Sequence, residues 1–292
     1  MADAFVIANG ELTARIAPLG AELLSLQDAA GREYMTDGDP AFWTGHAPVL
    51  FPIVGALNGG KFRHGGREYA LAKHGFARGS MFTCEEHEQG GWARFALEAS
   101  GETRRVYPFE FRLELLFELR GPTLCMTATV TNRGDAPMPF SFGFHPAFAW
   151  PLPKGGDKLA HDIVFQHDEP RDIRRVDGDG LIARDEISPV RGDRFALAPD
   201  LFEDDALIWD ELTSRRLTYR GMNGVALDIA FPDTPMLGIW QKPGANYICI
   251  EPWAGIADPA GYAGDLVDKP GIMELAPGSA RAFRMDVTVI HG

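Results

Sequence analysis

Residues 109–120 read FEFRLELLFELR, and this stretch decides the fold class. Every odd-numbered position in it is Phe or Leu, and every even-numbered position is charged except Leu116. Successive side chains of a β-strand point to opposite faces, so the alternation predicts one long, half-buried strand. Gly121 and Pro122 interrupt the pattern, and apolar residues then recur at alternate positions over 124–130. We therefore expect an antiparallel hairpin.

The same two-residue period recurs at 93–97 and 283–289, whereas helical periodicity never persists for three turns. Asp, Gly and Pro accumulate over 151–205 and 254–271, which predicts long loops in both regions. No internal repeat and no low-complexity linker divides the 292 residues. The pattern predicts an all-β chain that forms a large antiparallel β-sandwich, as a single domain over residues 1–292.

The composition limits the partners and the compartment. The formal net charge is −13, and nucleic acids and anionic membranes both favour clustered Lys and Arg, so neither is expected as a partner. The same acidity favours a neutral substrate over a strongly anionic one. The three cysteines have no paired spacing, no apolar run approaches about 18 residues, and no basic leader precedes an apolar run at the N-terminus. We therefore expect a cytoplasmic protein without disulfides or membrane spans.

Two strand-like segments place a titratable side chain on one face of a sheet. In SFGFH, residues 141–145, the first, third and fifth side chains share a face, and the glycine leaves room for a ligand beside His145. In YICIEPW, residues 247–253, Glu251 ends a mostly apolar run and precedes a tryptophan. A carboxylate in such a place is partly desolvated, which raises its pKa and makes it a better base near neutral pH.

Each of these residues also has a purely structural interpretation. A lone histidine on a strand is usually a hydrogen-bonded structural residue, and an acid at a strand end is often a solvated edge charge. In KHGFAR, residues 73–78, His74 could cap a turn before Gly75, and Arg78 could form a surface ion pair of little energetic value. Taken singly, the residues leave both interpretations open.

Five short motifs, taken together, favour the functional interpretation. They are PVLFPIVG at 48–55, HGFAR at 74–78, FGFHPAF at 142–148, LFEDDALI at 201–208 and CIEPWAGIAD at 249–258. In this order and spacing they resemble the aldose 1-epimerase (galactose mutarotase-like) superfamily, and most closely its LacX-type branch. Each motif alone is moderately specific, and the resemblance runs over nearly the whole chain.

The resemblance implies a supersandwich fold and a cofactor-independent isomerase that interconverts the α and β anomers of a free aldose bound in a groove across one sheet. Glu251 matches the general base that takes the proton from the C1 hydroxyl, and His145 matches the general acid that protonates the ring oxygen. His74 matches a second histidine that holds and polarises the sugar near that oxygen. Asp205 matches an acid that binds sugar hydroxyls, and Trp253 is expected to form an apolar wall.

One position departs from the pattern of this branch. Where LacX-type chains usually carry an arginine that reaches the substrate, this chain has Ala56. The change could alter sugar preference, reduce activity, or be compensated by Arg78 or Lys61. The departure keeps open a non-catalytic carbohydrate-binding or sugar-sensing protein. A hexose-6-phosphate 1-epimerase is another alternative, for which Arg78 is available, but the overall acidity and the missing arginine at position 56 weigh against it. A further alternative is a glycoside hydrolase that uses Asp205 and Glu251 as a carboxylate pair.

The other residues that could bind a metal or the substrate have structural interpretations or stay open. No metal site is expected, because the eight histidines show no HxxxH or HxH spacing. Cys249 lies on the Glu251 face without a basic neighbour in sequence, so we interpret it as a packing residue. Asp258 either orders the loop after Trp253 or contacts the ligand. The sequence identifies neither the aldose nor the oligomeric state, for which a monomer and a homodimer are both open.

Overall fold

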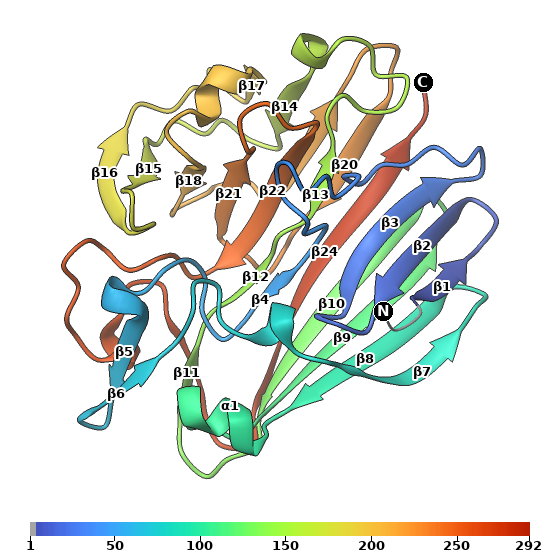
Figure 1. The fold of residues 1–292 in the computed structure, drawn as a ribbon. Coiled ribbons are helices and arrows are strands. Elements are labelled where there is room, and N and C mark those ends of the chain that lie inside the picture. Colours follow the sequence, from blue (N-terminus) through green and yellow to red (C-terminus); the bar gives the residue numbers. More distant parts are fainter. Residues whose placement is uncertain (1–3) are drawn as a thin grey trace.

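The computed structural model describes residues 4–292, so the first three residues of the predicted domain lie outside the described part. Two large antiparallel sheets face each other, and the β1–β2–β3 sheet lies against the β8 and β9 end of the larger one (Figure 1). The predicted all-β class and antiparallel β-sandwich are confirmed. No helix in the described residues is both long and apolar enough to cross a membrane.

The larger sheet has nine strands in the order β17-β14-β19-β20-β24-β10-β9-β8-β7. Their bounds are β7 Thr83–Glu88, β8 Trp92–Glu98, β9 Phe111–Arg120, β10 Thr123–Asn132, β14 Asp162–Phe165, β17 Arg194–Ala196, β19 Arg216–Arg220, β20 Ala226–Ala230 and β24 Ala280–Ile290.

The opposing sheet has eight strands, in the order β16-β15-β18-β21-β22-β12-β4, with β13 also paired to β22. Their bounds are β4 Val49–Leu50, β12 Phe142–Phe144, β13 Ala147–Ala149, β15 Ile173–Val176, β16 Ile182–Glu186, β18 Leu207–Trp209, β21 Met236–Trp240 and β22 Tyr247–Ala254.

Smaller elements surround these sheets. The remaining strands are β1 Phe5–Ala8, β2 Leu12–Ala17, β3 Glu22–Asp28, β5 Lys61–His64, β6 Arg67–Ala70, β11 Met138–Phe140 and β23 Met273–Leu275. The helical segments are α1 Gly101–Val106 and the 3-10 turns η1 Asn58–Gly60, η2 Ala77–Gly79, η3 Lys158–Ala160, η4 Pro199–Phe202 and η5 Leu266–Asp268.

Within the stretch at 109–120, residues 111–120 form the long strand β9 that the alternation predicts. Along β9 the Phe and Leu side chains are buried, and the intervening side chains are half-buried until the exposed Arg120. The strand pairs with β10 from Arg120 opposite Thr123, so Gly121 and Pro122 are the whole hairpin loop, and Gly121 supplies a φ of 58°. A left-handed φ of this kind is accessible to glycine at little cost. The predicted hairpin is therefore confirmed.

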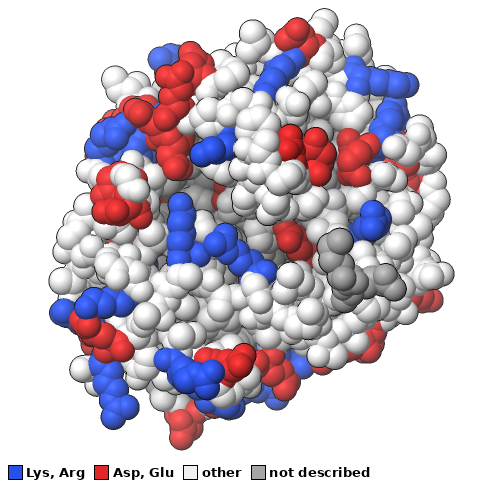
Figure 2. Space-filling view, in the orientation of Figure 1, with Lys and Arg blue, Asp and Glu red and all other residues white. Residues whose placement is uncertain are grey.

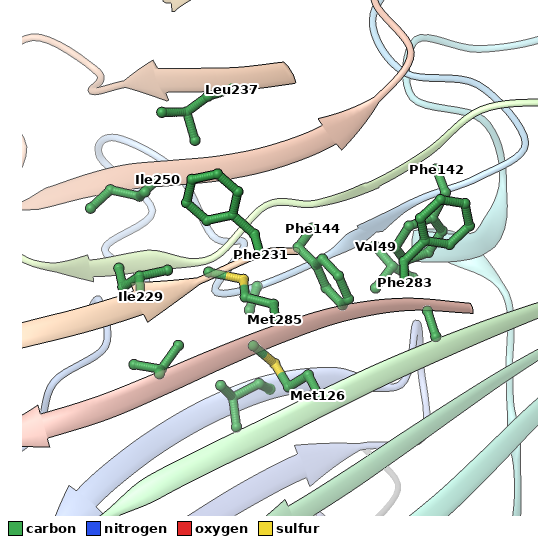
Figure 3. Close-up of a cluster of buried hydrophobic side chains, with 14 of the residues drawn as sticks. Val49, Met126, Phe142, Phe144, Ile229, Phe231, Leu237, Ile250, Phe283 and Met285 are labelled. Carbon is green, nitrogen blue, oxygen red and sulfur yellow. The ribbon is translucent and has the colours of Figure 1, made fainter. Parts of the chain in front are cut away.

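The core lies between the two large sheets (Figure 3). Leu237 and Ile250 of the eight-stranded sheet point toward Ile229 and Met285 of the nine-stranded sheet. At one end Phe142 and Phe283 stack with ring centroids 4.9 Å apart, and both side chains are fully buried. Burying one such side chain contributes about 1.5–3 kcal/mol, so this layer holds the sheets together. This apolar layer also determines which face of β22 points away from the core.

Two sequence expectations about strands were wrong. Residues 151–205 contain four short strands, β14 to β17, where loops were expected, whereas 254–271 is indeed free of strands after Ala254. Residues 140–145 do not form one strand either. Phe140 ends β11, which pairs with β23, and the chain then crosses to the other sheet as β12. The break at Ser141 directs that side chain toward Gly255 and not toward the face that carries His145.

Candidate active site

A cavity of about 200 Å³ opens on the face of the eight-stranded sheet that points away from the core. Figure 2 shows a hollow on this side of the molecule, with Lys and Arg side chains at its edge. All six residues that the sequence singles out line the cavity: His74, Arg78, His145, Asp205, Glu251 and Trp253. Four separate segments of the chain contribute them, and the fold brings them together.

Glu251 and His145 are in contact at the bottom of this cavity. Glu251 lies on β22, while His145 lies in the short connection between β12 and β13, two strands that pair with successive parts of β22. Its Nε2 is 3.2 Å from Glu251 Oε2, and the side chains are only 8% and 3% exposed. Neither Glu251 Oε2 nor His145 Nδ1 has a hydrogen-bond partner within residues 4–292. Because buried polar atoms are normally paired, two unpaired atoms in one contact distinguish this pair from an ordinary structural hydrogen bond.

Burial acts on the two groups in opposite directions. Desolvation raises the pKa of Glu251 well above its ordinary value, an effect that Asp205 increases and Lys73 opposes. Desolvation also lowers the pKa of His145 to about 3, and the positive charge of Arg78 adds to this effect. Burial therefore raises the free energy of any protonation state in which the Glu251–His145 pair carries a net charge.

His74 is held rigidly at the edge of the cavity. Its backbone N–H donates to the carbonyl of Gly55, and the N–H of Gly55 donates to His74 Nδ1 at 3.1 Å. Burial lowers the pKa of His74 well below its ordinary value, so the ring is neutral. Since Nδ1 accepts a hydrogen bond, the proton is on Nε2. His74 has a left-handed φ of 69°, and Gly75 after it packs so closely on Phe51 that a Cβ would lie 2.1 Å from the carbonyl oxygen.

The packing of Trp253 against two glycines contradicts the expectation that Gly143 leaves room for a ligand beside His145. A Cβ on Gly143 would lie 2.6 Å from Trp253 Cδ1, and a Cβ on Gly238 would lie 2.4 Å from its Cη2. The indole ring therefore lies flat across both glycines, and the space beside His145 that Gly143 leaves is filled by Trp253 instead of being open to a ligand. The ring packs with Ile208 and lines the cavity as an apolar surface.

The loop that carries Asp205 is ordered by an arginine that sequence reasoning missed. The buried Arg175 donates to the carbonyl oxygens of Asp205 and Leu201, and its guanidinium pairs with Glu186 at 2.8 Å. Asp205 has a left-handed φ of 67°, and its Oδ1 accepts from the N–H of Ala206 at 2.7 Å. One carboxylate oxygen is thus fixed by the backbone, which sets the direction of the other.

Three further residues of the cavity were not singled out from the sequence. The ring of Trp43 lies 5.0 Å from that of His145, and Trp240 lies 5.9 Å from Trp43 in a T-shaped arrangement. Lys73 lines the cavity next to His74 in sequence. The expected substitute Lys61 lies elsewhere, because it is paired with Glu68 across the β5–β6 hairpin. An isolated tryptophan in the 37–48 loop gives no periodic signal that could have predicted its place.

Comparison with known proteins identifies the relatives of this chain. The aldose 1-epimerase family profile matches residues 3–256. The LacX protein of Lactococcus lactis subsp. lactis is 31% identical, over 97% of this chain and 98% of its own. The chain belongs to the aldose 1-epimerase family. The predicted LacX-type branch is confirmed as well.

Solved structures place the chain in the same family. A galactose mutarotase related enzyme from Lactobacillus acidophilus is 34% identical and superposes with a TM-score of 0.90, over 99% of this chain and 97% of the other. A galactose mutarotase-like protein from Lactobacillus casei is 30% identical, with a TM-score of 0.89 over 98% and 99%. The fold of this aldose 1-epimerase family member is thus shared over its whole length.

Asp258 forms a buried ion pair within the loop after β22 and connects this loop to the segment at 56–58. Asp258 Oδ1 lies 3.3 Å from Lys269 Nζ, and both side chains are almost fully buried. Asp258 Oδ2 accepts from the N–H of Asn58, and the N–H of Asp258 donates to the carbonyl of Ala56. These contacts decide the question about Asp258, because the residue orders the loop.

Replacing Asp258 with Asn should destabilise the protein by about 3–5 kcal/mol, because Lys269 would keep a buried charge without its partner. The free energy of unfolding in urea measures this directly. The exposed Asp135→Asn is the matched control and should change it by less than about 0.5 kcal/mol. Adding Lys269→Met should recover part of the loss. A loss below about 1 kcal/mol in the single variant would mean that the pair does not hold the loop.

A group of three buried residues could in principle hold a metal ion in this aldose 1-epimerase family member. The donor atoms of His145, Cys249 and Glu251 lie within 4.8 Å of one another. Burial raises the pKa of Cys249 well above its ordinary value, which opposes the thiolate that a metal would need. The absence of a metal therefore stays a prediction. The three cysteines are unpaired in the described part of the chain.

Proposed function

We propose that the protein interconverts the α and β anomers of an aldose by general acid–base ring opening and closure. The contact between Glu251 and His145 at the bottom of the cavity carries this proposal. Mutarotation needs a base at the C1 hydroxyl and an acid at the ring oxygen. These two oxygens are bonded to the same carbon, so a base and an acid that touch each other can reach both.

The proposed reaction moves two protons and breaks one bond. Glu251 takes the proton of the C1 hydroxyl, the bond from C1 to the ring oxygen breaks, and His145 gives a proton to the ring oxygen. The open-chain aldehyde rotates about the C1–C2 bond. The reverse transfers then close the ring on the other face of the carbonyl and restore both groups. Since no electron or group leaves the sugar, the chemistry requires no cofactor.

The opposite pKa shifts support a pair that holds one proton in total. A protonated Glu251 with a neutral His145 and a carboxylate with an imidazolium contain the same proton and carry the same net charge. Burial favours the first form, and a sugar hydroxyl that donates to Glu251 favours the second. Over a separation of 3.2 Å, the bound substrate can therefore generate the base and the acid together.

The other cavity residues fit the binding of a sugar. His74 is neutral with its proton on Nε2, and in the proposed complex this N–H donates to the ring oxygen as negative charge develops there. The free oxygen of Asp205 accepts from sugar hydroxyls. Trp43, Trp240 and Trp253 provide the apolar surface for the carbon-bound faces of the ring.

The test is the rate of anomer exchange, measured by NMR magnetisation transfer on a panel of aldoses between pH 5 and 9. We expect acceleration with a flat kcat/KM profile through the range around pH 6.5, in which an ordinary histidine titrates. Below that range the pair gains a second proton only near the pKa of His145, about 3, and then the carboxylate is lost. Above it the pair loses its only proton at the raised pKa of Glu251, and then the acid is lost.

Spontaneous mutarotation also depends on pH, so the rate of each sample without protein is subtracted. A limb of the profile near pH 6.5, the ordinary value for histidine, would contradict the one-proton pair. No acceleration of any sugar in the panel would contradict the proposed activity itself. Sugar binding without exchange would then favour the carbohydrate-binding alternative.

A further inference from the structure

Three side chains of metal-binding type meet on one antiparallel ladder at the bottom of the cavity. β13 pairs Ala147 with Cys249. Two residues along each segment, the same register places His145 opposite Glu251, and β12 continues it beyond them. Cys249 and Glu251 are two residues apart on β22, so their side chains share the face that points away from the core. The sheet therefore presents an imidazole, a thiol and a carboxyl group side by side.

The donor atoms of these side chains have nearly the spacing of a tetrahedral ion site. Zn²⁺ bonds are about 2.0–2.1 Å long to nitrogen or oxygen and about 2.3 Å to sulfur, so neighbouring donors lie about 3.3–3.6 Å apart. His145 Nε2 and Glu251 Oε2 are 3.2 Å apart, and the three donor atoms lie within 4.8 Å of one another. The imidazole and carboxyl groups can therefore stay in place, while Cys249 Sγ has to approach them by at most about 1.3 Å.

Charge balance favours a divalent ion in this buried place. When Glu251 and His145 hold one proton in total and the thiol of Cys249 is neutral, the three side chains carry no net charge. A divalent ion that replaces the proton of the pair and the proton of the thiol releases two protons to solvent. The resulting group of ion, carboxylate, thiolate and imidazole is again neutral. Burial opposes a free thiolate, but this exchange adds no net charge to the buried site.

The cavity gives an ion access to these ligands. His145 and Glu251 line it, and Cys249 is fully buried beside them. An ion held by the three side chains would keep its fourth position toward the cavity, where a water molecule can bind. Lys73 and Arg78 also line the cavity, but an exchange that leaves the net charge unchanged gives them little to repel.

We propose that His145, Cys249 and Glu251 bind a thiophilic divalent ion such as Zn²⁺, and that the bound ion excludes the sugar from the acid–base pair. The ion is an inhibitor and not a cofactor, because it occupies the atoms that proton transfer needs. The reaction itself is still expected to need no metal. Ion binding does not depend on the proposed function, whereas the inhibition rests on it. Mg²⁺ prefers six oxygen ligands and should not bind at this site.

The test titrates the protein with Co²⁺, which takes the place of Zn²⁺ in tetrahedral sites and shows a bonded thiolate by its charge-transfer absorption. The variant Cys84→Ser/Cys125→Ala keeps Cys249 as the sole thiol of the chain. We expect one Co²⁺ per chain to produce this absorption in the variant and in wild type, and Zn²⁺ but not Mg²⁺ to abolish it. Cys249→Ala, added to the double variant or made in wild type, should remove the absorption at this stoichiometry. Its absence from wild type would overturn the proposal, whether or not the protein exchanges anomers.

The same titration tests the other two ligands. Glu251→Gln and His145→Asn should each weaken Co²⁺ binding by at least about tenfold, and unchanged binding in either variant would overturn the proposed ligand set.

The inhibition is measured with Zn²⁺ and wild type. At sugar concentrations well above KM, a tenfold increase in sugar should raise the Zn²⁺ concentration for half-inhibition about tenfold, because ion and sugar compete. Inhibition that does not depend on the sugar concentration, or none at saturating Zn²⁺, would overturn the exclusion of the sugar while the mutarotase activity stands. If wild type exchanges no sugar, the proposed function fails, and the Co²⁺ titration still decides the ion site.

Discussion

Glu251→Gln is expected to lower the rate of anomer exchange by at least about 1,000-fold while sugar binding is retained. The amide has the shape of the carboxyl group and still accepts a hydrogen bond from the C1 hydroxyl. It cannot take the proton, so the bond from C1 to the ring oxygen cannot break by the proposed route. The measurement is magnetisation transfer at saturating sugar, together with a fluorescence titration of the tryptophans that line the cavity.

The burial of Glu251 makes this variant a clean test. Because desolvation favours the neutral carboxylic acid in the empty cavity, a neutral amide should cost little stability. We expect a change in Tm of less than about 3 °C. Glu11→Gln also removes one carboxylate, at an exposed position that does not line the cavity, and it is the matched control. An exchange rate within about tenfold of wild type in Glu251→Gln would remove Glu251 as the base.

His145→Asn should reduce exchange by at least about 100-fold, the usual range for loss of a positioned acid. Asparagine retains a hydrogen-bond donor near the ring oxygen but cannot deliver a proton to it. The variant also removes the ring that packs at 5.0 Å from Trp43, so Tm is measured beside the rate to separate folding from catalysis. Exchange at the wild-type rate by a folded variant would show that another group protonates the ring oxygen.

The two histidines should respond differently to substitution. His145 faces Glu251, whereas the Nδ1 of His74 is occupied by the N–H of Gly55. His74 can therefore donate a hydrogen bond from Nε2, and within residues 4–292 it lies within 4.0 Å of no carboxylate oxygen. The proposed division of roles follows from these contacts. The resemblance predicted both histidines, but only the structure gives the tautomer of His74.

The fold could be predicted well where one face of a strand is buried. The alternation at 109–120, 124–130 and 283–289 reports a sheet with a core on one side, and these segments lie next to one another as β9, β10 and β24. The strands at 162–196 were missed because they have only three to five residues. One of them, β16, is largely exposed, so it has no apolar face to alternate.

The sequence predicted which residues form the candidate site, but it did not predict how they are arranged in space. Short motifs marked His74, His145 and Glu251, whose chemistry depends on the residue type. Trp43 and Arg175 carry no motif, since one only has to be large and aromatic and the other only has to reach several carbonyl groups. Their contribution depends on which segments the two sheets bring together.

The charge of the cavity walls does not follow from the charge of the whole surface. The net charge of −13 describes the whole surface, and it favoured a neutral substrate. The cavity instead has Lys73 and Arg78 on its walls, without a partner among the described residues. Lys61 was a reasonable substitute for the missing arginine by sequence distance. The β5–β6 hairpin directs it to Glu68, and the turn before His74 brings Lys73 to the cavity in its place.

The most direct test of the central claim is one pair of magnetisation-transfer measurements, with wild type and Glu251→Gln, on a sugar that fluorescence shows to bind both. With wild type, we expect magnetisation to transfer between the anomers far faster than in the sugar alone, and we expect the variant to bind the sugar without accelerating the exchange. Equal acceleration by both proteins, or none by wild type, would contradict the central claim.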